Sequence, residues 1–258
     1  MQTQIVLVTP EMAKQFLSNN INNRNIRKSW VGDLVKLIKN GEWKTTHQGI
    51  AFSSAGRLLD GQHRLMAIVD ANIACLMAVT TNMEDGVFDV IDRGERRTHA
   101  DIHGLSRRDA EILTVAMKLL DSRPTSQQVG RLVGGRIHKQ AEKLSSRHAY
   151  SVKVFSSAGM RLALCIQSLI NPSHEDFLFE QYRSLCTHTF DSMDKVSKAF
   201  LKTTLGGNYV TDQRTSVMHG MKLYSPIRRE LMLFRVGTDE SSELINSAID
   251  FVRADIAK

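Results

Sequence analysis

Apolar and polar residues in the first hundred positions follow two different periods. Short runs rich in β-branched residues at Gln4–Val8 and Ala74–Thr80 predict strands. Gly49–Phe52 and Arg57–Leu59 predict two more strands, joined by a turn at residues 53–56 that ends in a glycine. This part of the chain therefore predicts a small sheet.

Helical spacing separates these strands. Thr9 and Pro10 are typical of a helix start, and the helix that they predict runs to about Asn19. Apolar residues across Ile26–Asn40 recur with a helical period, and Gly41 follows where a left-handed cap is expected. Three further helices are predicted over Gln62–Asp70, over Phe88–Ile91 and from Thr98 to His103.

From Leu105 onward the strand period disappears and helical patterns continue to the end of the chain. We therefore predict an α+β protein with a mixed-sheet domain at residues 1–104 and an all-helical domain at residues 105–258. The helices predicted in the second domain span 107–121, 126–133, 136–146, 150–170, 174–188, 193–205, 212–222, 226–235 and 240–257.

The composition favours a globular cytoplasmic protein. The 258 residues are 42% hydrophobic with only 4 Pro, and no apolar run approaches the length that spans a bilayer. The N-terminus has no basic segment ahead of an apolar one, so no secretory signal is expected. Cys75, Cys165 and Cys186 have neither disulfide nor zinc spacing, and we interpret them as small buried apolar residues.

Positive charge is concentrated in the middle of the chain. The net charge is +7 overall, and residues 105–165 carry 11 Lys and Arg against 4 Asp and Glu. A helix starting at Arg136 places Arg136, Lys139 and Lys143 on one face, which favours contact with a nucleic-acid backbone. A solvated helical face is the alternative. The residues assigned to this contact are Arg131, Arg136, Lys139, Lys143 and Arg147.

The most specific string is Gly56–Ile68, which reads as a strand, a tight glycine turn and a helix start. The first amides of a helix lack intrahelical partners and carry partial positive charge, so such a turn can hold a phosphate. Arg64 can bind a phosphate with two hydrogen bonds, and His63 can donate one or take a proton. The structural alternative is that Asp60 caps the helix, Arg64 pairs with an acid and His63 lies at the surface.

The Asp-Gly-Gln-His-Arg letters of 60–64 resemble the ParB-like N-terminal domains of phage and plasmid proteins. Gly41-Glu42-Trp43 upstream and the string from Ile91 to Thr98 downstream add to this resemblance, which covers about residues 5–104. These domains belong to the ParB/sulfiredoxin superfamily. In that superfamily the turn binds nucleotide phosphates: ATP in sulfiredoxin, ADP or ATP in free-serine kinases and CTP in partitioning proteins.

The resemblance implies a nucleoside triphosphate with Mg²⁺ at this turn. Gly61, His63 and Arg64 would touch phosphate, while Asp60 and Gln62 would shape the turn. Glu42 and Asp60 would bind Mg²⁺ and, with His63, would be catalytic; the alternative for Glu42 is an acid facing solvent. Arg93, Arg96 and Arg97 would reach the triphosphate or DNA, or pair with nearby acids. Gln62 stands where sulfiredoxin has its reactive cysteine, so sulfinic-acid repair is excluded.

The leading hypothesis is a phage- or plasmid-type DNA-associated protein that binds, and conceivably hydrolyses, a nucleoside triphosphate. One alternative is a non-enzymatic regulator that binds DNA or inhibits a host protein. Another is a ParB-like nuclease, although the sequence has no carboxylates arranged for two metals. The apolar surface of the predicted helices also makes a homodimer plausible.

Overall fold

The computed structural model describes residues 1–21, 23, 25–84, 98–206, 212–225 and 238–257. The chain divides into two compact units, residues 1–96 and 97–258, and each is described here by itself. Strands and helices both occur, so the protein is of the α+β class, as predicted.

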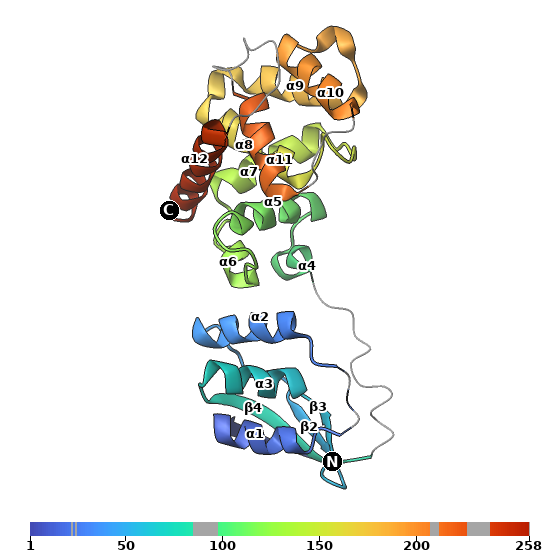
Figure 1. The fold of residues 1–258 in the computed structure, drawn as a ribbon, viewed down its shortest axis with the longest axis vertical. Coiled ribbons are helices and arrows are strands. Elements are labelled where there is room, and N and C mark those ends of the chain that lie inside the picture. The colour runs from blue at the N-terminus through green and yellow to red at the C-terminus, as the bar shows by residue number, and fades with distance from the viewer. Residues whose placement is uncertain (22, 24, 85–97, 207–211, 226–237, 258) are drawn as a thin grey trace. The chain divides into compact units, whose positions relative to one another are not determined.

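The first unit is built on a four-stranded mixed sheet in the order β1-β4-β2-β3 (Figure 1). The pairs β1–β4 and β2–β3 are antiparallel, and the pair β2–β4 is parallel. The strands are β1 (Gln2–Val8), β2 (Ile50–Ser53), β3 (Leu58–Asp60) and β4 (Cys75–Met83), and the helices are α1 (Pro10–Ser18), α2 (Lys28–Lys39) and α3 (Gln62–Ala71).

One face of this sheet forms the core of the unit. Val8, Met77 and Ile50 are buried with residues of all three helices, whereas Ile5 and Leu7 alternate with them and are exposed. α3 contacts both α1 and α2. The helix that follows the glycine turn is therefore fixed at the centre of the unit.

Capping residues and local sequence patterns predicted the positions of these elements. Thr9 caps α1 through a hydrogen bond from the Met12 amide, and Gly41 has the left-handed backbone expected after α2, with φ of 69°. All four predicted strands and the helices near 10–19, 26–40 and 62–70 are confirmed, with shifted ends. The predicted helix Phe88–Ile91 lies outside the described residues.

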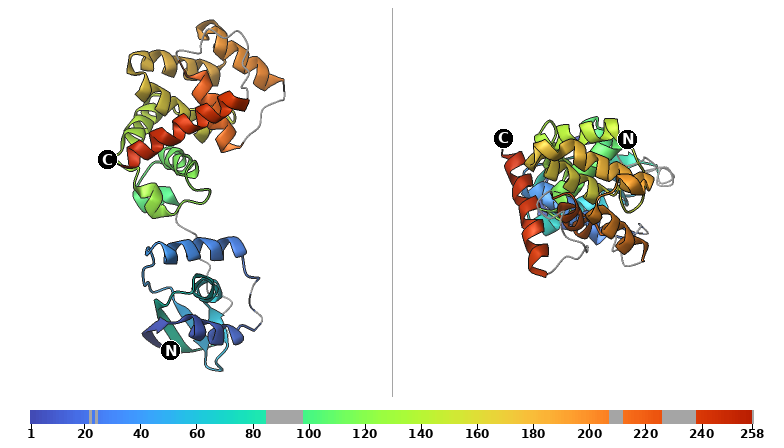
Figure 2. Two further views of the ribbon diagram at one scale, coloured as in Figure 1. Left: turned by 60° about the vertical axis from the view of Figure 1, so that its left-hand side comes forward. Right: turned by 90° about the horizontal axis from the view of Figure 1, so that it is seen from above.

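Every regular element described in the second unit is helical. In the views of Figure 2, α12 runs along the outside of this unit, and it contacts α5, α7, α8 and α11. The helices are α4 (His99–His103), α5 (Arg107–Lys118), α6 (Ser126–Gly130), α7 (Arg136–Arg147), α8 (Ala158–Ile170), α9 (Glu175–Thr187), α10 (Lys195–Leu205), α11 (Gln213–Leu223) and α12 (Thr238–Ile256).

α8 is the central helix of the second unit. All of its residues from Ala158 to Ser168 are buried, and it contacts α5, α7, α9 and α11. Even Arg161 is inside, where Nη2 donates to Glu111 Oε2 at 2.7 Å and Nε to the Ser156 carbonyl at 3.0 Å. A buried arginine needs such partners, because an unpaired charge is costly in the core.

One helix predicted in the second unit needs correction. The helix predicted over 150–170 starts only at Ala158, because Ser156 closes a turn onto Val152 and Ser157 caps α8. Contacts divide the chain near residue 96, so α4, which packs on α5 and α6, belongs to the second unit. The predicted helix at 226–235 lies outside the described residues. Within the described part of the chain, no helix has the length and apolar character needed to cross a membrane.

Candidate functional site

The turn between β3 and α3 is tight because glycine occupies its central position. Gly61 has φ of 102°, and an added Cβ would lie 3.1 Å from the Ile50 Cα. The Gly61 amide donates to Asp60 Oδ1 at 2.6 Å. A side chain at residue 61 would therefore strain the backbone and press on β2. β3 ends at Asp60 and α3 begins at Gln62, so Gly61 alone separates the strand from the helix.

Arg64 folds back over this turn. Its Nη1 donates to the Gly49 carbonyl at 3.1 Å and to Asp60 Oδ2 at 3.4 Å, and its Nη2 donates to Gln48 Oε1 at 3.4 Å. The Arg64 and Asp60 side chains are 22% and 26% exposed. The structure thus shows the pairing of Arg64 with an acid that the structural alternative expects, and the guanidinium still reaches solvent.

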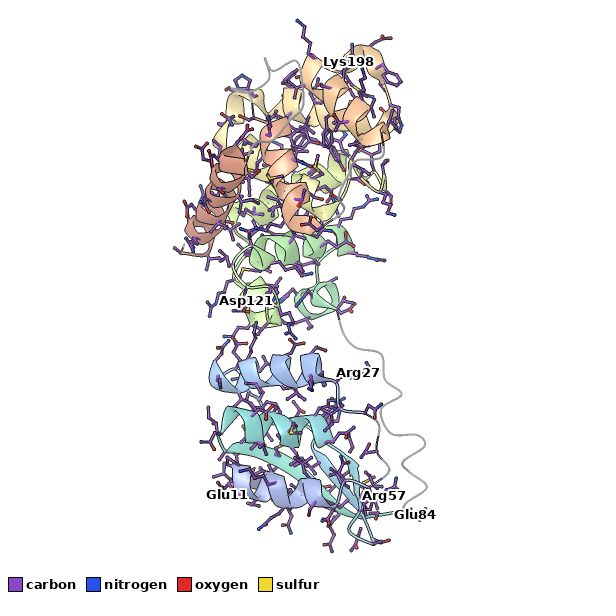
Figure 3. The ribbon with its side chains drawn as sticks, viewed as in Figure 1. Glu11, Arg27, Arg57, Glu84, Asp121 and Lys198 are labelled. Atoms are coloured by element: carbon purple, nitrogen blue, oxygen red, sulfur yellow. The ribbon has the colours of Figure 1, made fainter. Side chains whose placement is uncertain are left out.

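Gln62 and His63 are buried, contrary to the alternative that places His63 at the surface. Gln62 Oε1 accepts from Asn20 Nδ2 at 3.1 Å, and His63 Nε2 accepts from the Arg27 amide at 3.0 Å. Arg27 lies at the start of α2 (Figure 3). Both side chains therefore tie α3 to the segment before α2. His63 Nε2 is therefore occupied as a hydrogen-bond acceptor in this arrangement.

Glu42 is not joined to the turn by any hydrogen bond in the described residues. Its Oε1 accepts from Asn40 at 3.4 Å, and its Oε2 is buried without a partner there. The next residue, Trp43, donates from Nε1 to the Leu76 carbonyl at the beginning of β4. The predicted catalytic set of Glu42, Asp60 and His63 is thus not assembled by contacts that the structure describes.

The predicted Mg²⁺ pair, Glu42 and Asp60, does not form a protein-only cage. Within the described ranges, no group of three or more His, Cys, Asp or Glu side chains is placed to hold a metal ion. Mg²⁺ commonly binds through one or two carboxylates together with substrate phosphates, which needs no such cage. Arg93, Arg96 and Arg97, predicted to reach the phosphates or DNA, lie outside the described residues.

α7 begins at Arg136, as predicted, but most of its cations are paired within the unit. Arg136 binds Asp255 through Nε at 3.2 Å and lies 4.6 Å from the centre of the Phe251 ring. Lys143 pairs with Glu175, and Arg147 Nη1 lies 3.2 Å from Asp176 Oδ1. These three cations of α7 therefore each have an acidic partner within the unit, and their contact with nucleic acid stays a prediction.

The acids that pair with these cations lie far from them in the sequence. The acids come from α9 and α12, in the part of the chain after residue 165, where acidic residues outnumber basic ones by 12 to 11. Arg131 and Lys139 are exposed and take part in none of the ion pairs among the described residues. They are the two predicted nucleic-acid contacts whose charge stays open to solvent.

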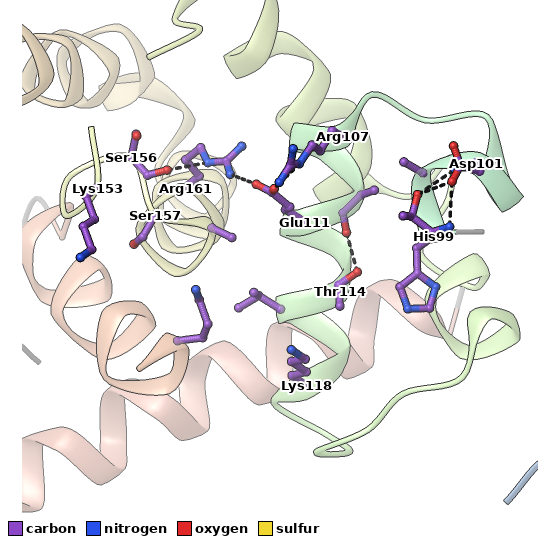
Figure 4. A pocket seen from close by; sticks show the side chains of 16 residues that line it. His99, Asp101, Arg107, Glu111, Thr114, Lys118, Lys153, Ser156, Ser157 and Arg161 are labelled. Carbon is purple, nitrogen blue, oxygen red and sulfur yellow. Dashed lines mark hydrogen bonds and ion pairs between the residues drawn. The ribbon is translucent and has the colours of Figure 1, made fainter. Parts of the chain in front are cut away.

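A cavity of about 880 Å³ in the second unit is a feature that sequence reasoning missed. It is bordered by α4, α5 and the segment leading into α8, and Arg107, Lys118, Lys153 and Arg161 are among its lining residues (Figure 4). The excess of positive charge at 105–165 was the available signal. It could not show that these segments meet.

The three cysteines are free and buried, as predicted. Burial raises the pKa of the Cys186 thiol to about 12, and it also raises the pKa of the Cys75 and Cys165 thiols. A thiol must ionise to act as a nucleophile. These side chains are therefore inert packing groups at neutral pH.

Comparison of this chain with protein-family models, with curated proteins and with solved structures finds no match. The resemblance of residues 5–104 to ParB-like domains therefore rests on the motif letters and their order. A functional assignment has to come from the geometry of the two units.

Proposed function

We propose that this protein binds a nucleoside triphosphate at the turn from Asp60 to Arg64, as a ParB/sulfiredoxin-like domain would, with the helical unit as its partner-binding part. The observation that carries this proposal is the left-handed Gly61 between β3 and α3, with Arg64 folded over the turn. The proposal is for binding rather than hydrolysis, because no described hydrogen bond joins Glu42 to the turn and His63 Nε2 already accepts from the Arg27 amide.

The turn offers two kinds of donor to a phosphate. The amides at the start of α3 carry the partial positive charge of a helix N-terminus, and Gly61 leaves the approach to them free of a side chain. Arg64 adds a guanidinium that can exchange its 3.4 Å contacts with Asp60 and Gln48 for shorter, charged contacts with phosphate oxygens. Its 3.1 Å bond to the Gly49 carbonyl can keep it in place.

Asp60 determines the need for a cation. Its Oδ2 lies beside Arg64 and its Oδ1 accepts from Gly61, so a phosphate at the turn would meet a carboxylate. The negative charges of the Asp60 carboxylate and of a nearby phosphate repel each other unless a positive ion lies between them. Asp60 would hold Mg²⁺ at this position, and the ion would supply charge neutralisation when a nucleotide binds.

The test is calorimetric titration of the full chain with Mg²⁺ complexes of ATP, CTP, GTP and UTP. We expect one of them to bind the wild type, and Arg64→Ala to weaken that affinity by roughly tenfold or more, since a charged hydrogen bond is lost. Arg64→Lys should lie in between, because it keeps the charge but not the planar fork. The control is Lys14→Gln on the exposed side of α1. Unchanged affinity in Arg64→Ala would overturn the proposal.

Dependence on Mg²⁺ provides a separate prediction. The wild type should bind the nucleotide much more weakly when EDTA removes the metal. In Asp60→Asn the carboxylate charge is gone, so binding should differ less between Mg²⁺ and EDTA. Equal dependence on the metal in both proteins would show that Asp60 takes no part in holding it.

A second candidate function is non-enzymatic binding of DNA by the helical unit. It is favoured by the exposed, unneutralised side chains of Arg131 and Lys139. Arg131→Glu with Lys139→Glu should then weaken binding of a short duplex and lower its salt dependence, because two phosphate contacts disappear. The control is Lys198→Glu, which reverses the charge of an exposed residue of α10. Equal DNA affinity in both variants would exclude this surface.

A further inference from the structure

The cavity in the second unit has the size and lining of a small-molecule site. Its volume of about 880 Å³ falls within the range of roughly 300–1,000 Å³ that is usual for ligand pockets. Part of its wall is apolar, with Ala100, Ala110, Val115 and Ala158 contributed by α4, α5 and α8. The other lining side chains are mostly polar or charged.

Positive groups reach the cavity from separate elements. Arg107 and Lys118 are the first and last residues of α5, and Lys153 lies on the segment before α8 (Figure 4). Arg107 and Lys118 are therefore about 16 Å apart along the helix axis. Lys118 and Lys153 are exposed and take part in no ion pair among the described residues.

The two acids that line the cavity are already engaged. Glu111 lies between two arginines, with Oε1 3.2 Å from Arg107 Nε and Oε2 2.7 Å from Arg161 Nη2. Asp101 Oδ2 accepts from the amide and hydroxyl of Thr98, both at 2.7 Å. One negative charge on Glu111 faces two guanidinium groups, so the cavity keeps a surplus of positive charge.

The start of α8 does not supply this charge. Its Gly159 amide donates to Gln213 Oε1 at 2.9 Å, and its Met160 amide donates to Ser157 Oγ at 3.4 Å. With these helix amides satisfied, recognition falls to the side chains of Lys118, Lys153 and Arg107. Arg107 is available as well, since its side chain is 91% exposed and only its Nε is used by Glu111.

We propose that this cavity binds a small phosphorylated organic molecule, with its phosphate groups on Lys118 and Lys153 and its organic part on the apolar wall of α4 and α5. The volume exceeds what one inorganic phosphate fills, so it leaves room for an organic part beside the phosphate groups. This site is separate from the turn at Gly61 and does not depend on it.

The test is calorimetric titration of the full chain carrying Arg64→Ala, so that the Gly61 turn is impaired. The probes are ADP and inorganic pyrophosphate, both without Mg²⁺. We expect ADP to bind at one site per chain, more tightly than pyrophosphate, because only ADP contacts the apolar wall. Adding Lys118→Gln and Lys153→Gln should weaken ADP binding by at least tenfold.

The matched control is Lys198→Gln with Lys202→Gln, which removes the same charge from exposed positions of α10. It should leave ADP affinity within about twofold of its parent, and all variants should keep the parent's melting temperature because the four lysines are exposed. The proposal is overturned if ADP does not bind, if both lysine pairs have equal effects, or if only a short DNA duplex binds and depends on Lys118 and Lys153.

Discussion

At the scale of single residues, the chain is least tolerant where the backbone of one segment touches another. Gly49 precedes β2, and a Cβ added there would lie 1.7 Å from the Ala78 carbonyl oxygen of β4. The Gly49 carbonyl also accepts from Arg64, so this residue links the sheet to the candidate phosphate turn. Sequence patterns identify such glycines as turn or strand residues but do not reveal what they touch.

We expect Gly49→Ala to lower the free energy of unfolding by more than about 2 kcal/mol, because β2 and β4 must separate to admit the methyl group. Urea denaturation followed by circular dichroism measures this change. Gly56→Ala is the comparison: its φ is +79° but nothing lies within 4 Å of the added Cβ, so about 1 kcal/mol is expected. Equal losses of unfolding free energy in the two variants would mean that a small shift of the backbone is enough to remove the contact with Ala78.

A half-buried histidine should make stability depend on pH. Burial, followed by the nearby Arg183, lowers the pKa of His148, whose ring lies against Tyr150, Phe179 and Tyr182. The unfolded chain, with its higher histidine pKa, binds more protons near pH 6. The stability contributed by neutral His148 is therefore complete above about pH 6.5 and decreases as the pH falls below it.

This effect is measurable as the change in melting temperature between pH 7.5 and 5.5. His148→Phe keeps an aromatic ring and cannot take a proton, so its melting temperature should fall less than that of the wild type over this range. If the two curves are parallel, His148 has the same pKa in the folded and unfolded chains.

At the scale of elements, helix starts were predicted where the signal is local. Thr9, Thr98 and Thr125 each cap a helix with their own side chain, and their positions could be identified from neighbouring residues. The start of α7 at Arg136 was predicted as well, but its cap was not, because Gly135 provides no capping side chain. Asp255, on α12, accepts from the Arg136 and Ile137 amides, both at 3.0 Å. Residues near Arg136 cannot predict a cap that comes from a residue 119 positions away.

Asp255→Ala should therefore destabilise the second unit by roughly 2–4 kcal/mol, since its fully buried carboxylate pairs with Arg136 and satisfies two helix amides. Asp250→Ala, which removes an exposed pair with Arg253 on the same helix, should cost less than about 1 kcal/mol. Thermal unfolding of both variants gives the comparison. Similar small losses would show that α12 does not hold the start of α7.

At the scale of the whole molecule, the sequence predicted where positive charge is concentrated but not which of these cations pair with acids and which line the cavity. The basic segment 105–165 was evident, yet acids of α9 and α12 neutralise Arg136, Lys143 and Arg147. The cations near the cavity come from α5 and the segment before α8, which only the packing of α5 against α8 brings together. The α+β class and the Gly61 turn were predictable because each depends on adjacent residues.

The central claim is that the start of α3 binds the phosphates of a nucleotide. Hydrogen–deuterium exchange of the full wild-type chain, with and without Mg²⁺ complexes of ATP, CTP, GTP and UTP, tests it most directly. Phosphate bound to the amides of residues 61–64 should slow their exchange for at least one nucleotide, while the solvent-facing amides of α10 stay unchanged. If no nucleotide slows exchange at residues 61–64, the turn is a structural feature and the claim is wrong.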